Sequence, residues 1–172
     1  MHLSVSVATM KQTPLRLLLD LVDEAFDRKA WHGTTLLGSI RGVSVDAAAW
    51  RPAPRRHNIW ELTVHAGYWK YAVRRLLTGE KRGSFALKGS NWFTRPATGA
   101  RRDEQAWAAD VRLLIAEHRR LRETIGALPE RALEQRLAGK PYTAAFTIRG
   151  IAAHDLYHAG QIQLIKRLRE GR

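Results

Sequence analysis

Two histidines, His154 and His158, stand four residues apart in the stretch Thr147–Leu168, which reads TIRGIAAHDLYHAGQIQLIKRL. The stretch has the periodicity of an amphipathic helix. With about 3.6 residues per turn, a helix places both imidazoles on one face, close enough to share a metal ion. They belong to a seam of inward positions at steps of three and four: Ile151, His154, His158, Gln161, Ile165 and Leu168. Polar groups on a buried seam need partners, and a metal ion is one such partner.

Two further histidines, His65 and His118, lie on the seams of other predicted helices. A single inward histidine is more often a hydrogen-bonded core residue than a ligand, but several that converge are costly unless something satisfies their nitrogen atoms. His65 with His154 and His158 would make a facial set of three nitrogen ligands, and His118 is the alternative ligand. The two seams contain Leu62, Trp69, Ala72 and Leu76 around His65, and Trp107, Val111, Leu114, Leu121, Ile125 and Leu128 around His118.

Three histidine ligands leave one or more positions open at a metal ion, which is the pattern of a catalytic site and not of a closed structural one. Zn²⁺, Ni²⁺, Fe²⁺ and Mn²⁺ are all compatible with this ligand set. Cysteine is absent from the chain. Disulfides, thiolate ligands and a cysteine nucleophile are therefore excluded, and any sulfur chemistry would need an external thiol.

Four predicted helices would position these residues. The first runs from Pro14 to about Ile40, with a possible interruption near Gly33. The second starts after the N-cap Asn58, with Glu61 completing a capping-box pattern, and runs to about Leu77. The third spans Asp103–Leu128 and stops before Pro129, and the fourth is capped by Thr147.

The connection from Gly79 to Arg102 is rich in Gly, Ser, Lys and Arg and has little periodicity. Its length allows it to travel the length of a 20-residue helix, so the second and third helices can be parallel. Strand-like alternation is not sustained anywhere. The predicted fold class is therefore all-α, a four-helix bundle with a long crossover between helices 2 and 3. We expect Trp92 and Phe93 of the crossover to pack on the bundle; covering a substrate pocket is the alternative.

The composition of the 172-residue chain indicates a globular protein with a single domain over residues 1–172. No run of apolar residues is long enough to span a membrane, and the first residues are too short an apolar stretch for a signal peptide, so we expect a cytoplasmic protein. The net charge of +13 favours encounters with anions. Its basic residues are scattered, however, which favours a solvated surface over the alternative of a nucleic-acid site.

The patterns NIWELTVHAGYW and TIRGIAAHDLYHAGQIQLIKRL, separated by a long interval, resemble the DinB-like, damage-inducible family. The run HxxxHxGQ, the Ala-Trp-Arg-Pro turn before the second helix and the Gly-Ser-Asn-Trp loop after it belong to the same resemblance, which covers essentially the whole chain. It implies a four-helix bundle with a crossover, a divalent metal ion held by a histidine triad, and a homodimer. Carried over to this sequence, the triad is His65, His154 and His158.

Some similar proteins are thiol-dependent transferases and others are hydrolases, so the resemblance implies a metal-dependent enzyme that activates water or an external thiol for a small-molecule substrate. A metal-binding protein without turnover, acting in stress-related interactions, is the second hypothesis. Gln161, one turn beyond His158, is well placed to orient that imidazole, whereas Asp155 points about 100° away from His154. Tyr68 and Tyr157 are expected to pack in the core more than to line a pocket.

Overall fold

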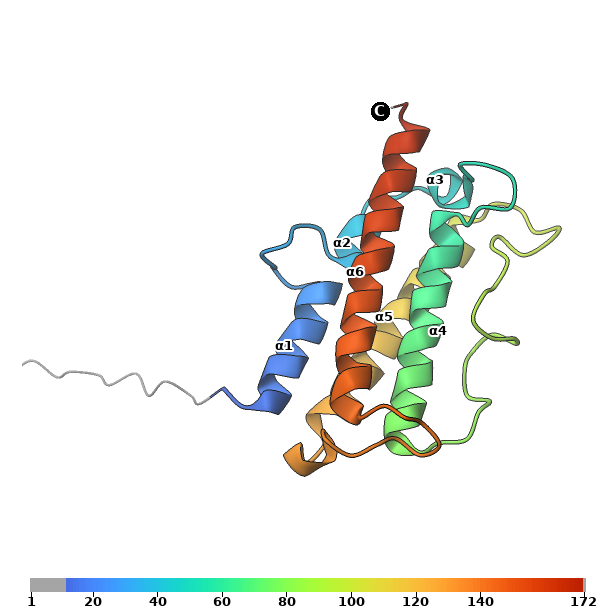
Figure 1. Ribbon diagram of the computed structural model, residues 1–172. Coiled ribbons are helices and arrows are strands. Elements are labelled where there is room, and N and C mark those ends of the chain that lie inside the picture. Colours follow the sequence, from blue (N-terminus) through green and yellow to red (C-terminus); the bar gives the residue numbers. More distant parts are fainter. Residues whose placement is uncertain (1–11, 172) are drawn as a thin grey trace, which may run out of the picture.

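The computed structural model describes residues 12–171, and every regular element within that range is a helix (Figure 1). The all-α prediction is confirmed for this range. Four helices are long and three are short. The long helices are α1 (Pro14–Phe26), α4 (Ile59–Thr78), α5 (Glu104–Gly126) and α6 (Ala144–Arg169), and the short ones are α2 (Leu36–Ile40), α3 (Val45–Ala49) and a 3₁₀ turn (Glu130–Ala132).

Helices α4 and α5 run in the same direction. Near the starts of both helices, the rings of Trp60 and Trp107 meet at 5.5 Å, and nearer their ends the Arg74 Nε atom lies 3.9 Å from a Glu117 carboxylate oxygen. The segment between the two helices returns along the outside of α4, from its end to the level of its start (Figure 1). Gly67 permits their close approach, because a Cβ atom at this position would lie only 3.3 Å from the Cα atom of Leu114.

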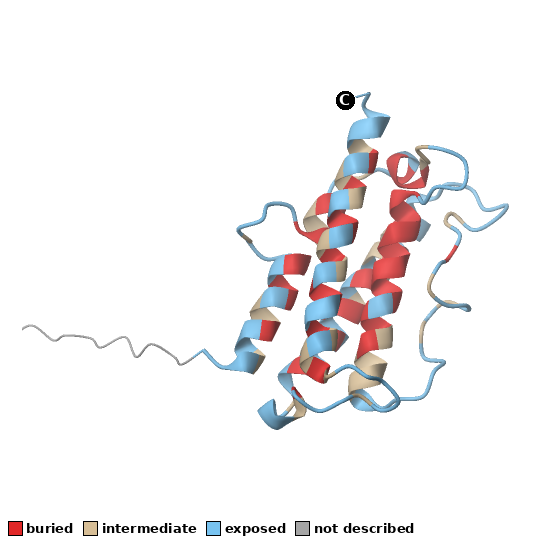
Figure 2. Ribbon diagram, viewed as in Figure 1, coloured by how far each residue is buried: buried red, intermediate tan, exposed pale blue. Residues whose placement is uncertain are grey.

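The remaining packing places α6 against both α1 and α4, and α1 also touches α5. Helix α4 is buried along most of its length, whereas α1 and α6 carry an exposed face (Figure 2). One hydrophobic cluster surrounds the first half of α4, and a second lies between α1, α5 and α6. A charged pair is buried where α4 meets α6, because the ammonium group of Lys70 contacts the carboxylate of Asp155.

The first predicted helix is wrong in extent. Its interruption is much wider than a kink near Gly33, since α1 ends at Phe26 and α2 starts only at Leu36. The Thr35 side chain accepts a hydrogen bond from the Gly38 backbone N–H, which makes it the N-cap of a new helix. A second short helix, α3, follows the N-cap Ser44.

The second and third predicted helices match α4 and α5 within two residues, and Asn58 caps α4 as predicted. The start of the fourth is wrong. Helix α6 is capped by Thr143, whose hydroxyl accepts from the Phe146 N–H, while the Thr147 hydroxyl donates back to the Thr143 carbonyl inside the helix.

Two residues predicted to face inward are exposed. Leu168 is 49% exposed, because the last turns of α6 extend beyond the ends of the neighbouring helices (Figure 1). Trp69 is 36% exposed at the rim of a surface cavity. Among residues 12–171, none of the helices combines the length and hydropathy that crossing a membrane requires.

Candidate metal centre

The imidazoles of His65, His154 and His158 converge between α4 and α6. The Nε2 atom of His154 lies 3.2 Å from that of His65 and 3.0 Å from that of His158, and one donor atom from each ring falls within 4.8 Å of the others. The helical spacing of the pair in α6 is thus met by a third ring from α4, as the sequence predicted. His118 is not part of this group.

The connection between α4 and α5, residues 79–102, which is called the crossover below, orients His65. Its Nδ1–H donates to the backbone carbonyl of Asn91 at 2.8 Å, and the Asn91 side-chain oxygen accepts from the Trp69 indole N–H at 2.9 Å. Asn91 has a φ of 65°, a left-handed conformation that asparagine tolerates better than most residues. One residue of the crossover therefore positions two side chains of α4.

Gln161 orients His158, as predicted. Its side-chain oxygen lies 2.7 Å from the Nδ1 atom of His158, one turn away on α6. The remaining ring has no such support, since the Nδ1 atom of His154 is buried without a hydrogen-bond partner among the described residues. Two of the three imidazoles are thus fixed by oxygen acceptors, and the third is placed by packing.

These contacts leave the centre short of hydrogen-bond donors. Because oxygen acceptors take the Nδ1–H groups of His65 and His158, the Nε2 atom of each neutral ring carries a lone pair. Both lone pairs face the His154 Nε2 atom, which has at most one hydrogen to offer. At least one lone pair therefore lacks a donor, and a cation would satisfy all three nitrogen atoms at once.

The spacing also fits a metal ion. Two nitrogen ligands about 2.0–2.1 Å from a common ion lie roughly 2.8–3.4 Å apart, from neighbouring octahedral to tetrahedral positions. The separations of 3.0 and 3.2 Å fall within that range. The donor set of three imidazoles suits zinc and the neighbouring divalent transition metals. The residues present therefore fit the group that the sequence implies.

Burial keeps the three rings neutral. It lowers the pKa of His65 to about 4, against the hydrogen bond to Asn91, which raises it. Burial, together with the neighbouring rings of His158 and His65, lowers the pKa of His154 to about 3. Burial is also the main reason why the pKa of His158 is lowered. Neutral imidazole is the form that binds metal ions.

Trp92 covers the centre from the crossover. Its ring stacks on His65 at 3.8 Å and, on its other face, on His57 at 3.6 Å. His57 in turn donates to Glu61 at 3.1 Å. The expectation of packing on the helices is confirmed for Phe93, which is buried, whereas Trp92 is 38% exposed and stacks on His65 with one face. His57, to which the sequence assigned no role, supports the tryptophan that covers His65.

Glu61 ties two loops to the start of α4. Besides His57, it accepts from the Arg51 guanidinium at 2.8 Å and from the Arg95 backbone N–H at 3.3 Å. Burial raises the pKa of Glu61, but the hydrogen bonds from Arg51, His57 and Arg95 outweigh it and lower the pKa overall. Only half of the predicted capping box forms. The Asn58 side chain accepts from the Glu61 backbone N–H, whereas the Glu61 side chain binds the two loops.

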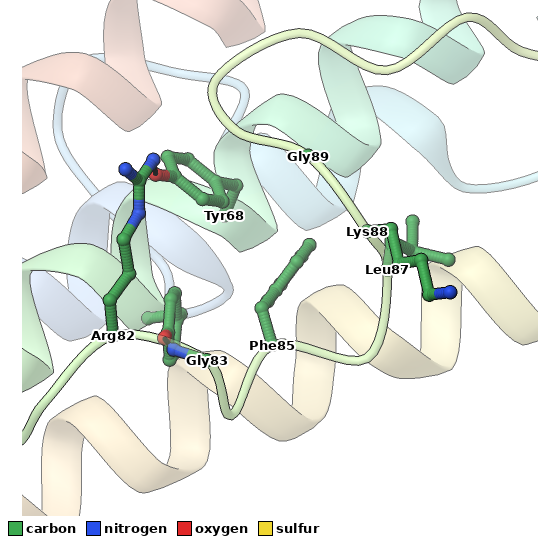
Figure 3. Close-up of a pocket in the computed structure, with 8 residues that line it drawn as sticks. Tyr68, Arg82, Gly83, Phe85, Leu87, Lys88 and Gly89 are labelled. Carbon is green, nitrogen blue, oxygen red and sulfur yellow. Dashed lines mark hydrogen bonds between the residues drawn. The ribbon is translucent and has the colours of Figure 1, made fainter.

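The first part of the crossover is held on α4 by two tyrosines. The Tyr71 hydroxyl accepts from the backbone N–H groups of Gly83 and Ser84 at 3.0 and 3.3 Å. Arg82 donates to the Tyr68 hydroxyl at 3.2 Å, and the Phe85 ring points from the crossover toward Tyr68 (Figure 3). Tyr68 is buried, as expected, whereas Tyr157 is 63% exposed, so the expectation that it packs in the core is wrong.

Two surface cavities flank the three histidines. His154 lines one of about 350 Å³, together with Trp69 of α4. His158 lines the other, of about 520 Å³, together with Trp92, Gln161 and His57. Since the two histidines are in contact, the centre forms the wall between two spaces large enough for small molecules.

His118 and Asp155 take part in a different buried cluster. His118 stacks on Phe26 at 3.6 Å and lies 3.9 Å from an Asp23 carboxylate oxygen. Burial, together with the charges of Lys70 and Arg122, lowers the pKa of His118 to about 2. Asp155 turns away from His154, as the sequence predicted, but its contact with Lys70 was not anticipated because that lysine lies 85 positions earlier in the chain.

Comparison with known proteins gives one match. The model of the DinB superfamily matches residues 28–162, a span that contains all three histidines, the crossover, α4 and α5. No curated protein and no solved structure matches the chain. Because the match covers most of the chain and the three imidazoles converge where the family resemblance placed them, this protein belongs to the DinB superfamily.

Proposed function

We propose that the protein is a metal-dependent enzyme in which His65, His154 and His158 hold a divalent ion, and that it activates water or an external thiol for attack on a small-molecule substrate. The observation that carries this proposal is the convergence of three Nε2 atoms, two of which present lone pairs set by Asn91 and Gln161. A purely structural role for the rings would leave at least one lone pair unsatisfied.

A divalent ion bound here would lower the pKa of a water or thiol that it binds and would polarise an electrophile. The residues of the chain would do the rest. Asn91 and Gln161 hold two imidazoles in one tautomer and orientation, which keeps the Nε2 atoms directed at the same point. Trp92 stacks on His65 and limits the access of water from the crossover side.

Two types of reaction are compatible with this centre. Hydrolysis needs only water as the nucleophile, whereas group transfer needs a thiol that this cysteine-free chain cannot supply from its own side chains. The two cavities beside His154 and His158 support a reaction of two small molecules, because one can reach the centre from each side. We further take the four long helices as a four-helix bundle, with residues 79–102 as its crossover, and we propose a homodimer.

The test uses metal-free protein reloaded with zinc, nickel, ferrous iron or manganese. Hydrolysis is assayed with ester and amide substrates, and transfer with a small thiol and an aromatic electrophile. We expect turnover in one of the two assays, dependent on the metal and lost in His154→Ala. The control is His32→Ala, because His32 is exposed in the loop between α1 and α2. Bound metal without metal-dependent turnover in any assay would contradict the enzyme and favour a metal-binding protein without turnover.

A further inference from the structure

The cavity of about 350 Å³ beside His154 has a composition that identifies its ligand class. It lies between α4, the start of α6 and the loop that precedes α6. Its volume falls at the small end of the range for small-molecule sites, which is about 300–1,000 Å³. The residues that decide its chemistry are Trp69, Lys140, Tyr142, Phe146, Gly150 and His154.

Aromatic rings form its walls. Tyr142 and Phe146 stack on each other with ring centres 5.0 Å apart and planes 13° apart, and both are about half exposed. The indole N–H of Trp69 is already bonded to Asn91, so this ring offers the cavity no free polar group. Exposed rings arranged around a hollow favour a flat apolar ligand.

The absence of a side chain at Gly150 leaves one part of the cavity open. Gly150 lies on the face of α6 that lines the cavity, and a Cβ atom built on it would meet nothing within 4 Å. Glycine in a helix interior costs stability relative to alanine, by about 1 kcal/mol. Packing against a neighbouring helix does not require it here, unlike at Gly67.

One side chain on the rim is a lysine. Lys140 lies in the loop before α6, where the Leu137 N–H bonded to the Tyr142 carbonyl at 3.0 Å holds a tight turn. The Lys140 ammonium makes no ion pair with any residue between 12 and 171. A ligand whose negative group reaches the rim would therefore gain a partner without displacing a carboxylate.

From these four observations we infer that the cavity binds the aromatic body of a small organic anion, with the anionic group at Lys140 and the ring between Trp69 and the Tyr142–Phe146 pair. His154 lines the same cavity, so the bound ring lies against the histidine centre. This inference deepens the proposed function by naming a substrate class. It rests on the proposed function only for the claim that the bound ligand is chemically transformed. Binding itself does not depend on turnover.

The first test compares two substitutions in one helix. Gly150→Leu fills the cavity, whereas Gly160→Leu places the same side chain at another open, exposed position of α6 that does not line it. The probe is 2-naphthoate, and its binding is measured by calorimetry. We expect roughly tenfold or greater weakening by Gly150→Leu, as for forcing a side chain into occupied space, and little change by Gly160→Leu. Equal affinities of the two variants would overturn the proposed location.

The second test concerns the charge. Lys140→Gln should weaken 2-naphthoate by up to about fivefold, as for a partly exposed ion pair, and leave the uncharged 2-naphthamide unaffected. Lys81→Gln is the control, because Lys81 is exposed and does not line the cavity. If naphthoate and naphthamide bound equally well, or if both lysine substitutions acted alike, the anionic class would be wrong.

Two further readouts separate this inference from competing explanations. Metal content is measured for each variant: metal bound with no probe binding overturns this inference alone, whereas probe binding without metal contradicts the proposed function alone. Sedimentation then compares Gly150→Leu with Gly160→Leu. A change of oligomeric state confined to Gly150→Leu would show that a second copy of the chain covers the cavity, and the small-molecule assignment would fail.

Discussion

At the scale of single residues, each imidazole of the centre is placed by a different means. A backbone carbonyl of the crossover fixes His65, a side-chain amide one helical turn away fixes His158, and packing alone places His154. The sequence predicted the contact of Gln161 because helical spacing is regular. It did not predict Asn91, because nothing in an aperiodic loop indicates which of its carbonyls will face a helix.

Gln161 offers a prediction at this scale. Gln161→Leu removes the acceptor of the His158 Nδ1–H, so the ring is no longer held in the tautomer whose Nε2 atom binds a cation. We expect metal affinity to fall about 10- to 100-fold, the usual cost of removing a group that orients a ligand. A competition titration against a metal-chelating dye measures it.

The matched control is Gln163→Leu, which makes the same change on α6 at a half-buried position outside the centre. Equal metal affinities of Gln161→Leu and Gln163→Leu would show that this hydrogen bond does not support metal binding.

At the scale of elements, the helices were predictable where apolar periodicity and a cap agree, as in α4 and α5. The start of α6 was misplaced because Thr143 and Thr147 can both act as caps, and only the loop that precedes the helix decides between them. The gap between α1 and α2 was underestimated for a related reason. A second N-cap at Thr35 competes with continuation of the first helix.

The packing of α4 on α5 gives a prediction at this scale. In Gly67→Val, the new side chain would meet the backbone of Leu114, whereas in Gly160→Val it enters open space. We expect the free energy of unfolding to fall by about 1–3 kcal/mol more in Gly67→Val, as in other overpacked interiors. Urea denaturation of both variants measures the difference, and equal stabilities would show that α4 and α5 can separate without cost.

At the scale of the whole molecule, the basic residues behind the net charge of +13 are scattered along the sequence. Several arginines are already paired with carboxylates, which reduces their potential for phosphate groups. The pairs are Arg51 with Glu61, Arg74 with Glu80, Arg95 with Asp110, Arg102 with Asp46, Arg120 with Glu117, and Arg122 with Asp23. We therefore expect a dispersed, solvated basic surface and no dedicated nucleic-acid site.

The dispersed charge predicts weak binding of duplex DNA. Between 50 and 200 mM salt, a protein with a dedicated site loses roughly 10³-fold or more in affinity, because it releases several counterions. We expect a much smaller loss here, starting from weak binding at low salt, as measured by fluorescence anisotropy. Tight binding with the steep dependence would support the nucleic-acid alternative instead.

The metal content of the protein, purified without an affinity tag, tests the central claim most directly. We predict about one divalent ion per chain, as for a single three-histidine site. His65→Ala combined with His158→Ala should abolish it while the helical circular dichroism persists, and His32→Ala, at an exposed loop position, should retain it. Unchanged metal content in the double variant would contradict the assignment of His65, His154 and His158 as the ligands.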